Sequence, residues 1–248
     1  QKVVFFQPKN AKAYYNLSVA LKVKGKLDDA LKAYKSLIEI QPNHPLAHNN
    51  MGNIFKIKGM QKEAINAYRK AISLKPNFAE AYNNLGATLN DLGKSDEAIN
   101  ALNQAISLKP NYASAYLNKS MALLKNQEFE KGFELYEWRF KTDDYSGKDI
   151  QSSKPLWNGQ KNKTVFLWSE QGIGDEIMYS SLIPELHKIC AKLIVQCDRR
   201  LIPLFKRSFN SDIHYCDGSD IVNDLIYDFH ISVGSLPRIF RKSLKKFK

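Results

Sequence analysis

The chain has 248 residues, of which 44% are hydrophobic, and a formal net charge of +12 at pH 7. This length and apolar content suffice for about two domains with buried cores, which excludes a largely disordered chain. The sequence has no run of about 18 apolar residues, and its basic residues are spread along the chain, so we predict neither a membrane-spanning segment nor a specific nucleic-acid partner.

The cysteines and histidines lack the spacing of a disulfide framework or a metal site. Cys190, Cys197 and Cys216 are odd in number and form no Cys-x-x-Cys pair, and the five histidines share no ligand spacing. We therefore predict no bound metal and a reducing, cytoplasmic location.

Four prolines, Pro8, Pro42, Pro76 and Pro110, lie 34 residues apart, and each is followed by a related Asn/Ala/Tyr-containing segment. A repeat of this length and composition is typical of tetratricopeptide (TPR) repeats, in which each unit is a pair of antiparallel helices. We predict a TPR array over residues 8–141, stacked as a superhelix with a concave inner wall that holds a protein or peptide.

Small residues and turn residues place the two helices of each repeat. In the third repeat, Gly86 and Ala98 are predicted to let the helices approach closely, and Gly59 and Gly93 mark inter-helix turns, where the fourth repeat has Gln127 instead. The fourth repeat ends in an aromatic surface over residues 133–140, which we expect to dock onto the part of the chain that follows.

An asparagine recurs at one position of the repeats and forms a predicted ladder on the inner wall. A primary amide offers a donor and an acceptor together, so it can pair with a peptide unit of an extended ligand. The ladder resembles that in the TPR region of O-linked N-acetylglucosamine transferases; the alternative is that these amides serve local packing. The candidate groove residues are Asn16, Asn50, Asn84 and Asn118, with Asn49 and Asn83 beside two of them.

After a polar linker at residues 142–163, the pattern changes to alternating strands and helices. Strands are predicted at 164–168, 192–197, 212–216 and 228–232, and helices at 176–191 and 199–209. This alternation predicts a parallel sheet, so the fold class is a TPR superhelix of about four helix pairs followed by a Rossmann-like α/β domain over residues 164–248.

The loop after the first predicted strand carries a Gly-x-Gly pattern at the sheet edge where open α/β folds bind ligands. Gly172 and Gly174 would allow a tight turn, and the following helix N-terminus favours an anion. A dinucleotide fingerprint needs a third glycine where the chain has Ile177, although Asp198 ends the next strand as a ribose-binding acid would. An ordinary tight turn is the alternative.

Four segments together carry a resemblance to bacterial TPR proteins fused to a heptosyltransferase-like glycosyltransferase. They are Tyr136-Glu137-Trp138-Arg139, Pro155-Leu156-Trp157-Asn158-Gly159, Glu170-Gln171-Gly172-Ile173-Gly174-Asp175 and Ser235-Leu236-Pro237. The resemblance implies the two-Rossmann GT-B fold, of which residues 164–248 would be the amino-terminal half.

The same resemblance implies roles for the loop after the first strand. Asp175 would be the general base that removes the acceptor hydroxyl proton, in an acceptor loop formed by Glu170, Gln171, Gly172 and Gly174. The alternative for Asp175 is a stabilising carboxylate at a helix N-terminus.

Two main functions remain open. In the first, the chain is the acceptor-side part of a glycosyltransferase that acts on a glycan or protein; the full-length parent would use a nucleotide sugar, while this part would bind no cofactor and lack turnover. In the second, it is a non-catalytic TPR adaptor with a structural α/β dock. A dinucleotide-dependent oxidoreductase is a third reading, weakened by Ile177.

Overall fold

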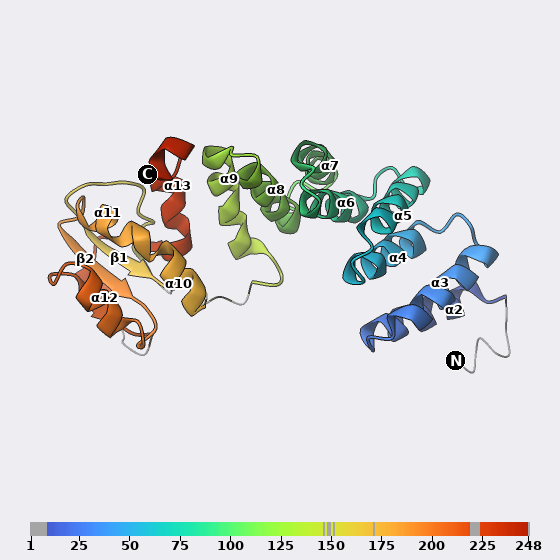
Figure 1. Ribbon diagram of the computed structural model, residues 1–248, viewed down its shortest axis with the longest axis horizontal. Helices are drawn as coiled ribbons and strands as arrows, with labels where there is room; N and C mark the ends of the chain where they lie inside the picture. Colours follow the sequence, from blue (N-terminus) through green and yellow to red (C-terminus); the bar gives the residue numbers. More distant parts are fainter. Residues whose placement is uncertain are drawn as a thin grey trace. The chain divides into compact units, whose positions relative to one another are not determined.

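The computed structural model describes residues 9–145, 147, 150, 152–170, 172–218 and 224–247. It divides into two compact units, the first ending at Asn126 and the second beginning at Gln127. The first unit is helical, and the second is built on a parallel sheet (Figure 1). This confirms the predicted fold class.

The first unit consists of antiparallel helix pairs in which α2 packs on α3, α4 on α5 and α6 on α7, and α8 packs on both α6 and α7. The period of 34 residues sets the positions of the successive helices, and each helix begins and ends close to the predicted turns. The described helices are α2 (Ala11–Val23), α3 (Leu27–Ile40), α4 (Pro45–Ile57), α5 (Gln61–Leu74), α6 (Ala79–Asp91), α7 (Ser95–Leu108) and α8 (Ala113–Lys125).

Glycines set both the close approach of paired helices and the turns between them. A Cβ at Gly86 would lie 2.6 Å from the Leu102 side chain and 3.1 Å from the Ala98 carbonyl oxygen, which confirms the predicted close contact of α6 and α7. At the turns, Gly59 and Gly93 have φ of +74° and +77°, a left-handed conformation that glycine adopts without strain.

Gln127 adopts the same left-handed conformation, with φ of 62°, in the turn where the earlier repeats have glycine. A side chain in this region carries a steric cost of roughly 1–2 kcal/mol. The chain therefore follows the repeat geometry at this turn even though its residue disfavours it.

The second unit contains a four-stranded parallel sheet in the order β3-β2-β1-β4. Its strands are β1 (Thr164–Trp168), β2 (Lys192–Gln196), β3 (His214–Cys216) and β4 (Phe229–Ser232). The α-helices are α9 (Phe129–Tyr136), α10 (Ile173–Tyr179), α11 (Ile183–His187), α12 (Ile202–Ser208) and α13 (Leu236–Phe240), and the 3₁₀ helices are η1 (Glu137–Lys141), η2 (Ser180–Leu182), η3 (Asp224–Ile226), η4 (Val233–Ser235) and η5 (Leu244–Phe247).

Both faces of the sheet are covered, as expected for parallel strands that carry apolar residues on both faces. Val165 and Leu167 of β1 point to one core, which includes Leu186 of α11, Phe205 of α12 and Leu236 of α13. The intervening residues of the strands face a second, smaller core on the other side of the sheet.

That second core receives a side chain from the end of the helical repeats. Phe140 of η1 packs against it, with its ring centroid 6.1 Å from that of Trp168 and 5.3 Å from that of Tyr145. Earlier in the same segment, the ring centroid of Phe129 in α9 lies 4.8 Å from that of Phe247. The expectation that the aromatic end of the fourth repeat docks onto the following part of the chain is therefore confirmed.

Part of the predicted linker at residues 142–163 belongs to the sheet unit. Leu156 forms a parallel bridge with His230, and the Trp157 amide donates to the His230 carbonyl oxygen at 2.8 Å. The Trp157 side chain is fully buried in the larger core, and its indole N–H donates to the Gln160 carbonyl oxygen.

The prediction of one continuous helix over residues 176–191 is wrong. The structure has α10, the short η2 and then α11, with Pro184 in the first turn of α11. Proline lacks an amide donor and clashes with the preceding turn, so it starts a helix rather than continuing one.

Candidate functional site

The asparagine ladder lies on the first helix of each repeat, at equivalent positions of α2, α4, α6 and α8. Asn50, Asn84 and Asn118 are half-buried, and Asn16 is exposed. The neighbouring Asn49 and Asn83 are buried, each with 6% of its surface exposed. The ladder therefore contains two kinds of amide, one at the surface and one beneath it.

The two kinds of amide bond to one another across successive repeats. Asn84 Nδ2 donates to Asn49 Oδ1 at 3.1 Å and to Asn53 Oδ1 at 3.1 Å, and Asn118 Nδ2 donates to Asn83 Oδ1 at 2.9 Å. Buried amides need such partners, because an unbonded buried polar group is costly. Part of the ladder thus holds the repeats together.

The other atom of each surface amide is left available. Among the described residues, no donor is bonded to Oδ1 of Asn84 or of Asn118. Asn84 Nδ2 uses both of its hydrogens in inter-repeat bonds, so the predicted two-point pairing with a peptide unit would require one of them to break, whereas Asn118 Nδ2 has one such bond and a second N–H. Both positions offer a fixed acceptor.

Between the first two repeats, the surface amide is bonded to a tyrosine and not to another asparagine. Asn50 Nδ2 lies 3.5 Å from the Tyr15 hydroxyl, and the Tyr15 ring stacks on His44 at 5.4 Å. Farther along the same helices, Lys56 pairs with Asp91 at 3.0 Å, and Ile57 is 64% exposed. Near Asn50 the surface is therefore aromatic, and toward the carboxyl end of α4 it carries an ion pair and an exposed apolar side chain.

The carboxyl edge of the sheet holds a buried ion pair between Arg139 and Glu170. Arg139 Nη2 lies 2.9 Å from both Glu170 oxygens, and Arg139 Nε lies 3.3 and 3.1 Å from them. Their side chains are 3% and 2% exposed. Glu170 follows β1, and Arg139 comes from η1, so the pair ties these two segments together.

Further groups complete the bonding of the guanidinium. Arg139 Nη2 donates to the Ser232 and Ser235 hydroxyls at 3.0 and 2.9 Å, and Arg139 Nη1 donates to Glu137 at 2.9 Å. The Gly234 backbone packs against the pair and leaves no room for a side chain, since a Cβ there would lie 2.0 Å from Glu170 Oε1. Arg139, Glu170, Ser232 and Ser235 are thus buried and hydrogen-bonded to one another.

Burial and charge act against each other on these two groups. The pKa of the Glu170 carboxyl is raised, because burial raises it by more than the Arg139 guanidinium lowers it. For Arg139, burial lowers the pKa, but Glu170 and Glu137 raise it and outweigh burial. Since both Glu170 oxygens accept from the guanidinium, we treat the pair as ionised at neutral pH.

Asp175, the candidate general base, lies half-buried in the first turn of α10. Its charge acts on two neighbouring phenols. Burial raises the pKa of Tyr136 and of Tyr179, and Asp175 adds to the increase in both. The surroundings of Asp175 are thus aromatic hydroxyls beside the buried ion pair.

The loop before α10 is open but does not form the predicted tight glycine turn. Gly172 has φ of −78° and ψ of 167°, which any residue adopts, and Gly174 lies within α10. A Cβ at either glycine would meet no atom within 4 Å. Gln171, the remaining acceptor-loop residue, lies outside the described residues.

Glu176 is a site residue that the sequence analysis missed. It is 7% exposed and accepts hydrogen bonds from the Ser169 hydroxyl and, at 2.7 Å, from the Asp198 amide, so it links the ends of β1 and β2. Asp198 itself pairs with Arg200 at 2.8 Å. The predicted ribose-binding acid is therefore engaged by its neighbour two residues on.

Arg139, Ser232 and Ser235 were also missed as site residues, although two of the segments behind the resemblance contain Arg139 and Ser235. In the structure, these segments meet the Glu170 segment at one cluster.

Among the described residues, no group of three or more potential metal ligands occurs. No described helix is long and apolar enough to cross a membrane.

Family models for the TPR repeat match residues 20–59 and 52–93, and a tetratricopeptide-repeat model matches residues 79–112. Protein FlbA of Caulobacter vibrioides is 31% identical over 96 residues, which are 37% of this chain and 16% of FlbA. The matched segment thus spans a small part of that relative's length.

Solved structures are similar over more than half of the chain. A chain of MamA from Desulfovibrio magneticus RS-1 that runs from residue 41 to its end is 26% identical with a TM-score of 0.50, over 55% of this chain and 77% of that chain. YrrB, described as a TPR protein with an unusual peptide-binding site, is 23% identical with a TM-score of 0.51, over 58% and 75%. None of these matches supplies evidence for a glycosyltransferase. The chain is therefore a TPR-repeat protein in which the helical repeats precede a small four-stranded parallel α/β unit.

Proposed function

We propose that the first unit binds an extended segment of another protein through the asparagine ladder, and that the second unit is a structural dock without catalytic activity. The observation that carries the proposal is the orientation of Asn84 and Asn118. Both Nδ2 atoms are bonded to the preceding repeat, and both Oδ1 atoms are without a donor among the described residues.

This arrangement suits the recognition of a peptide main chain. A peptide main chain presents an N–H donor at each non-proline residue, and equivalent acceptors on successive repeats could each accept one of them. Because the inter-repeat bonds hold each amide in place, little side-chain entropy is lost on binding. The selectivity for side chains then falls to the flanking surface, including the stacked pair of Tyr15 and His44.

The second unit supports the adaptor reading because its most polar cluster is internally satisfied. Arg139, Glu170, Ser232 and Ser235 bond to one another and are buried. A site that binds substrate needs polar groups directed to an open pocket. This cluster instead fixes η1 onto the sheet.

A titration against selected peptides tests the peptide-binding proposal. Unstructured 12-residue peptides would be selected from a displayed library on the whole chain and measured by calorimetry. The double variant Asn84→Ala, Asn118→Ala is expected to weaken binding by about 2 kcal/mol, roughly thirtyfold, because two hydrogen bonds are lost.

Two controls separate binding from packing. Asn49→Ala with Asn83→Ala breaks two of the three inter-repeat bonds and keeps the one from Asn84 to Asn53, and it leaves the surface amides, so it should lower stability with a smaller loss of affinity. Asn66→Ala with Asn100→Ala removes exposed asparagines at the same spacing on α5 and α7 and should change neither. Equal affinity losses in the first two double variants would contradict the proposal.

A second candidate is the acceptor half of a glycosyltransferase with a protein or glycan acceptor and a nucleotide sugar as donor. The supporting observation is the half-buried Asp175 carboxylate at the carboxyl edge of a parallel sheet with the order β3-β2-β1-β4. A base at that edge could accept the proton of an attacking hydroxyl.

Binding of the donor distinguishes the two candidates. Under the adaptor proposal, uridine, guanosine and adenosine diphosphate sugars bind this chain no more tightly than about 1 mM, or −4.1 kcal/mol. Micromolar affinity in calorimetry, accompanied by transfer that Asp175→Asn lowers by about 10²–10⁴-fold, would favour the glycosyltransferase instead.

A further inference from the structure

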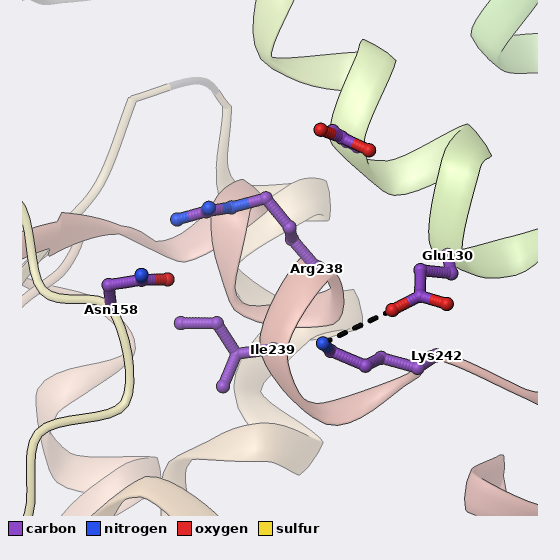
Figure 2. A pocket seen from close by; sticks show the side chains of 6 residues that line it. Glu130, Asn158, Arg238, Ile239 and Lys242 are labelled. Carbon is purple, nitrogen blue, oxygen red and sulfur yellow. Dashed lines mark hydrogen bonds and ion pairs between the residues drawn. The ribbon is translucent and has the colours of Figure 1, made fainter.

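The second unit contains a pocket of about 290 Å³ that the asparagine ladder and the buried ion pair do not use (Figure 2). Helix α9 contributes Glu130 and Glu134 to its wall, and α13 contributes Arg238 and Ile239. Lys242, just after α13, and Asn158, in the segment before β1, complete the lining. The size is near the lower end of the range for small-molecule sites.

The Arg238 guanidinium is the unusual group in this pocket. Its Nε atom is buried and has no hydrogen-bond partner, and no hydrogen bond or ion pair joins its side chain to any other described residue. A buried donor without an acceptor is unfavourable, and an arginine presents five donors in a planar fork. The group is therefore suited to an oxyanion that enters the pocket.

Neighbouring arginines show that this state is particular to Arg238. Arg241, three residues farther on, bonds both oxygens of Glu185, and the buried Arg139 bonds Glu170. Lys242, in the same pocket, pairs with Glu130 at 3.3 Å. Among these cations, Arg238 alone forms no ion pair with a described residue, although Glu130 and Glu134 line the same pocket.

The rest of the lining restricts the ligand. Figure 2 shows the guanidinium end of Arg238 and the amide of Asn158 on one side of Ile239, and the Lys242–Glu130 pair on the other. Glu134 is exposed, and its carboxylate forms no ion pair with a described residue. The pocket thus combines a free guanidinium, an apolar side chain and a free carboxylate.

We propose that this pocket binds a small amino carboxylate. Its carboxylate would accept from Arg238 and from the Asn158 amide, its short aliphatic chain would cover Ile239, and its ammonium group would lie at Glu134. A planar carboxylate matches the guanidinium fork in two parallel hydrogen bonds. A phosphate dianion fits less well, because Glu130 and Glu134 repel its second charge.

A matched series of probes tests the proposal. The whole chain would be titrated with 4-aminobutyrate, butyrate, butylamine and inorganic phosphate, and binding followed by ligand-observed NMR. We expect 4-aminobutyrate to bind at least threefold more tightly than butyrate and tenfold more tightly than butylamine or phosphate. Equal affinity for 4-aminobutyrate and butyrate would overturn the role of Glu134, and no binding of any probe up to about 20 mM would overturn the site.

Three variants locate the binding. Arg238→Gln is expected to weaken 4-aminobutyrate at least tenfold, and Glu134→Gln to weaken it about threefold while leaving butyrate unchanged. Arg207→Gln changes an exposed arginine of α12 and should have no effect. Binding that persists in Arg238→Gln would overturn the assignment.

In Arg238→Gln, a loss of binding can be distinguished from a loss of stability. Because the Arg238 side chain has no partner among the described residues, Arg238→Gln should keep the urea midpoint of the free protein within error. A large fall in that midpoint would show that Arg238 has a structural role and would also overturn the proposal.

Discussion

Replacing either member of the buried pair is expected to destabilise the second unit strongly, whereas replacing both should cost much less than the sum. Arg139→Met leaves Glu170 as a buried, unpaired carboxylate, and Glu170→Leu leaves Arg139 in the corresponding state. Each single change should lower the free energy of unfolding by about 3–5 kcal/mol.

The magnitude follows from the burial of the pair. Both side chains are nearly inaccessible, at 3% and 2% exposure, so water cannot replace the missing partner. In the double variant neither charge of the Arg139–Glu170 pair remains, although Ser232 and Ser235 lose their bonds to the guanidinium and the partly exposed Glu137 carboxylate loses its cation. We therefore expect a coupling energy of at least about 2 kcal/mol.

Tryptophan fluorescence isolates the relevant transition. The chain has three tryptophans, Trp138, Trp157 and Trp168, and all of them lie in the second unit. With a urea m value of about 1–3 kcal/mol/M, a loss of about 4 kcal/mol lowers the midpoint by roughly 1–4 M.

The Arg200–Asp198 pair provides the matched control, because its side chains are 69% and 28% exposed. The corresponding cycle, Arg200→Met with Asp198→Leu, should give a coupling of about 1 kcal/mol or less. A coupling between Arg139 and Glu170 no larger than that of this surface pair would refute the reasoning.

Three other predictions concern backbone fit and buried thiols. Gly234→Ala should destabilise the second unit by about 1–3 kcal/mol, because its Cβ would lie 2.0 Å from a carboxylate oxygen of the buried pair. Gly174→Ala, where a Cβ meets no atom, should be neutral or stabilising by up to about 1 kcal/mol. Similar urea midpoints for the two variants would contradict this. Gln127→Gly should stabilise the protein by about 0.5–1 kcal/mol, because φ is 62°, and a lowered thermal midpoint would argue against it. Burial raises the pKa of Cys190 and Cys197 from 9.0 to about 12. The contribution of these two neutral thiols to the free energy of unfolding is therefore fully present below pH 9 and is lost as the pH rises toward 12. Cys197, which is 3% exposed, should resist iodoacetamide at pH 8 until urea unfolds the chain, and rapid labelling of this residue in the native protein, followed by mass spectrometry, would count against its burial.

The repeats and strands could be predicted because their signals are local. The period of 34 residues placed the helix pairs, and the apolar run at 164–168 coincides with β1. The break between α10 and α11 also had a local signal in Pro184, which the apolar periodicity of residues 176–191 obscured.

The buried pair could not be predicted in the same way. Arg139 and Glu170 are 31 residues apart, and Ser232 and Ser235 lie more than 90 residues from Arg139. Nothing in the local pattern at Glu170 distinguishes a buried partner of arginine from an exposed acceptor-loop residue. Only the parallel order of β1 and β4 brings these segments to one edge.

For the asparagine ladder, spacing predicted the positions but not the bonding. Asn84 and Asn49 are 35 residues apart, one more than the repeat, as are Asn118 and Asn83, so these two bonds join a surface amide to the adjacent position of the preceding unit. That offset depends on how successive repeats stack, which a single repeat does not determine.

The placement of α9 and Arg139 in the second unit has a consequence for how such proteins change in evolution. Repeat arrays lengthen and shorten by gain or loss of whole units. A breakpoint after Lys141 would carry Arg139 away with the array and leave Glu170 enclosed without its cation. A breakpoint in the turn at Gln127 would keep the pair intact, so repeat number can vary at that turn without disturbing the α/β unit.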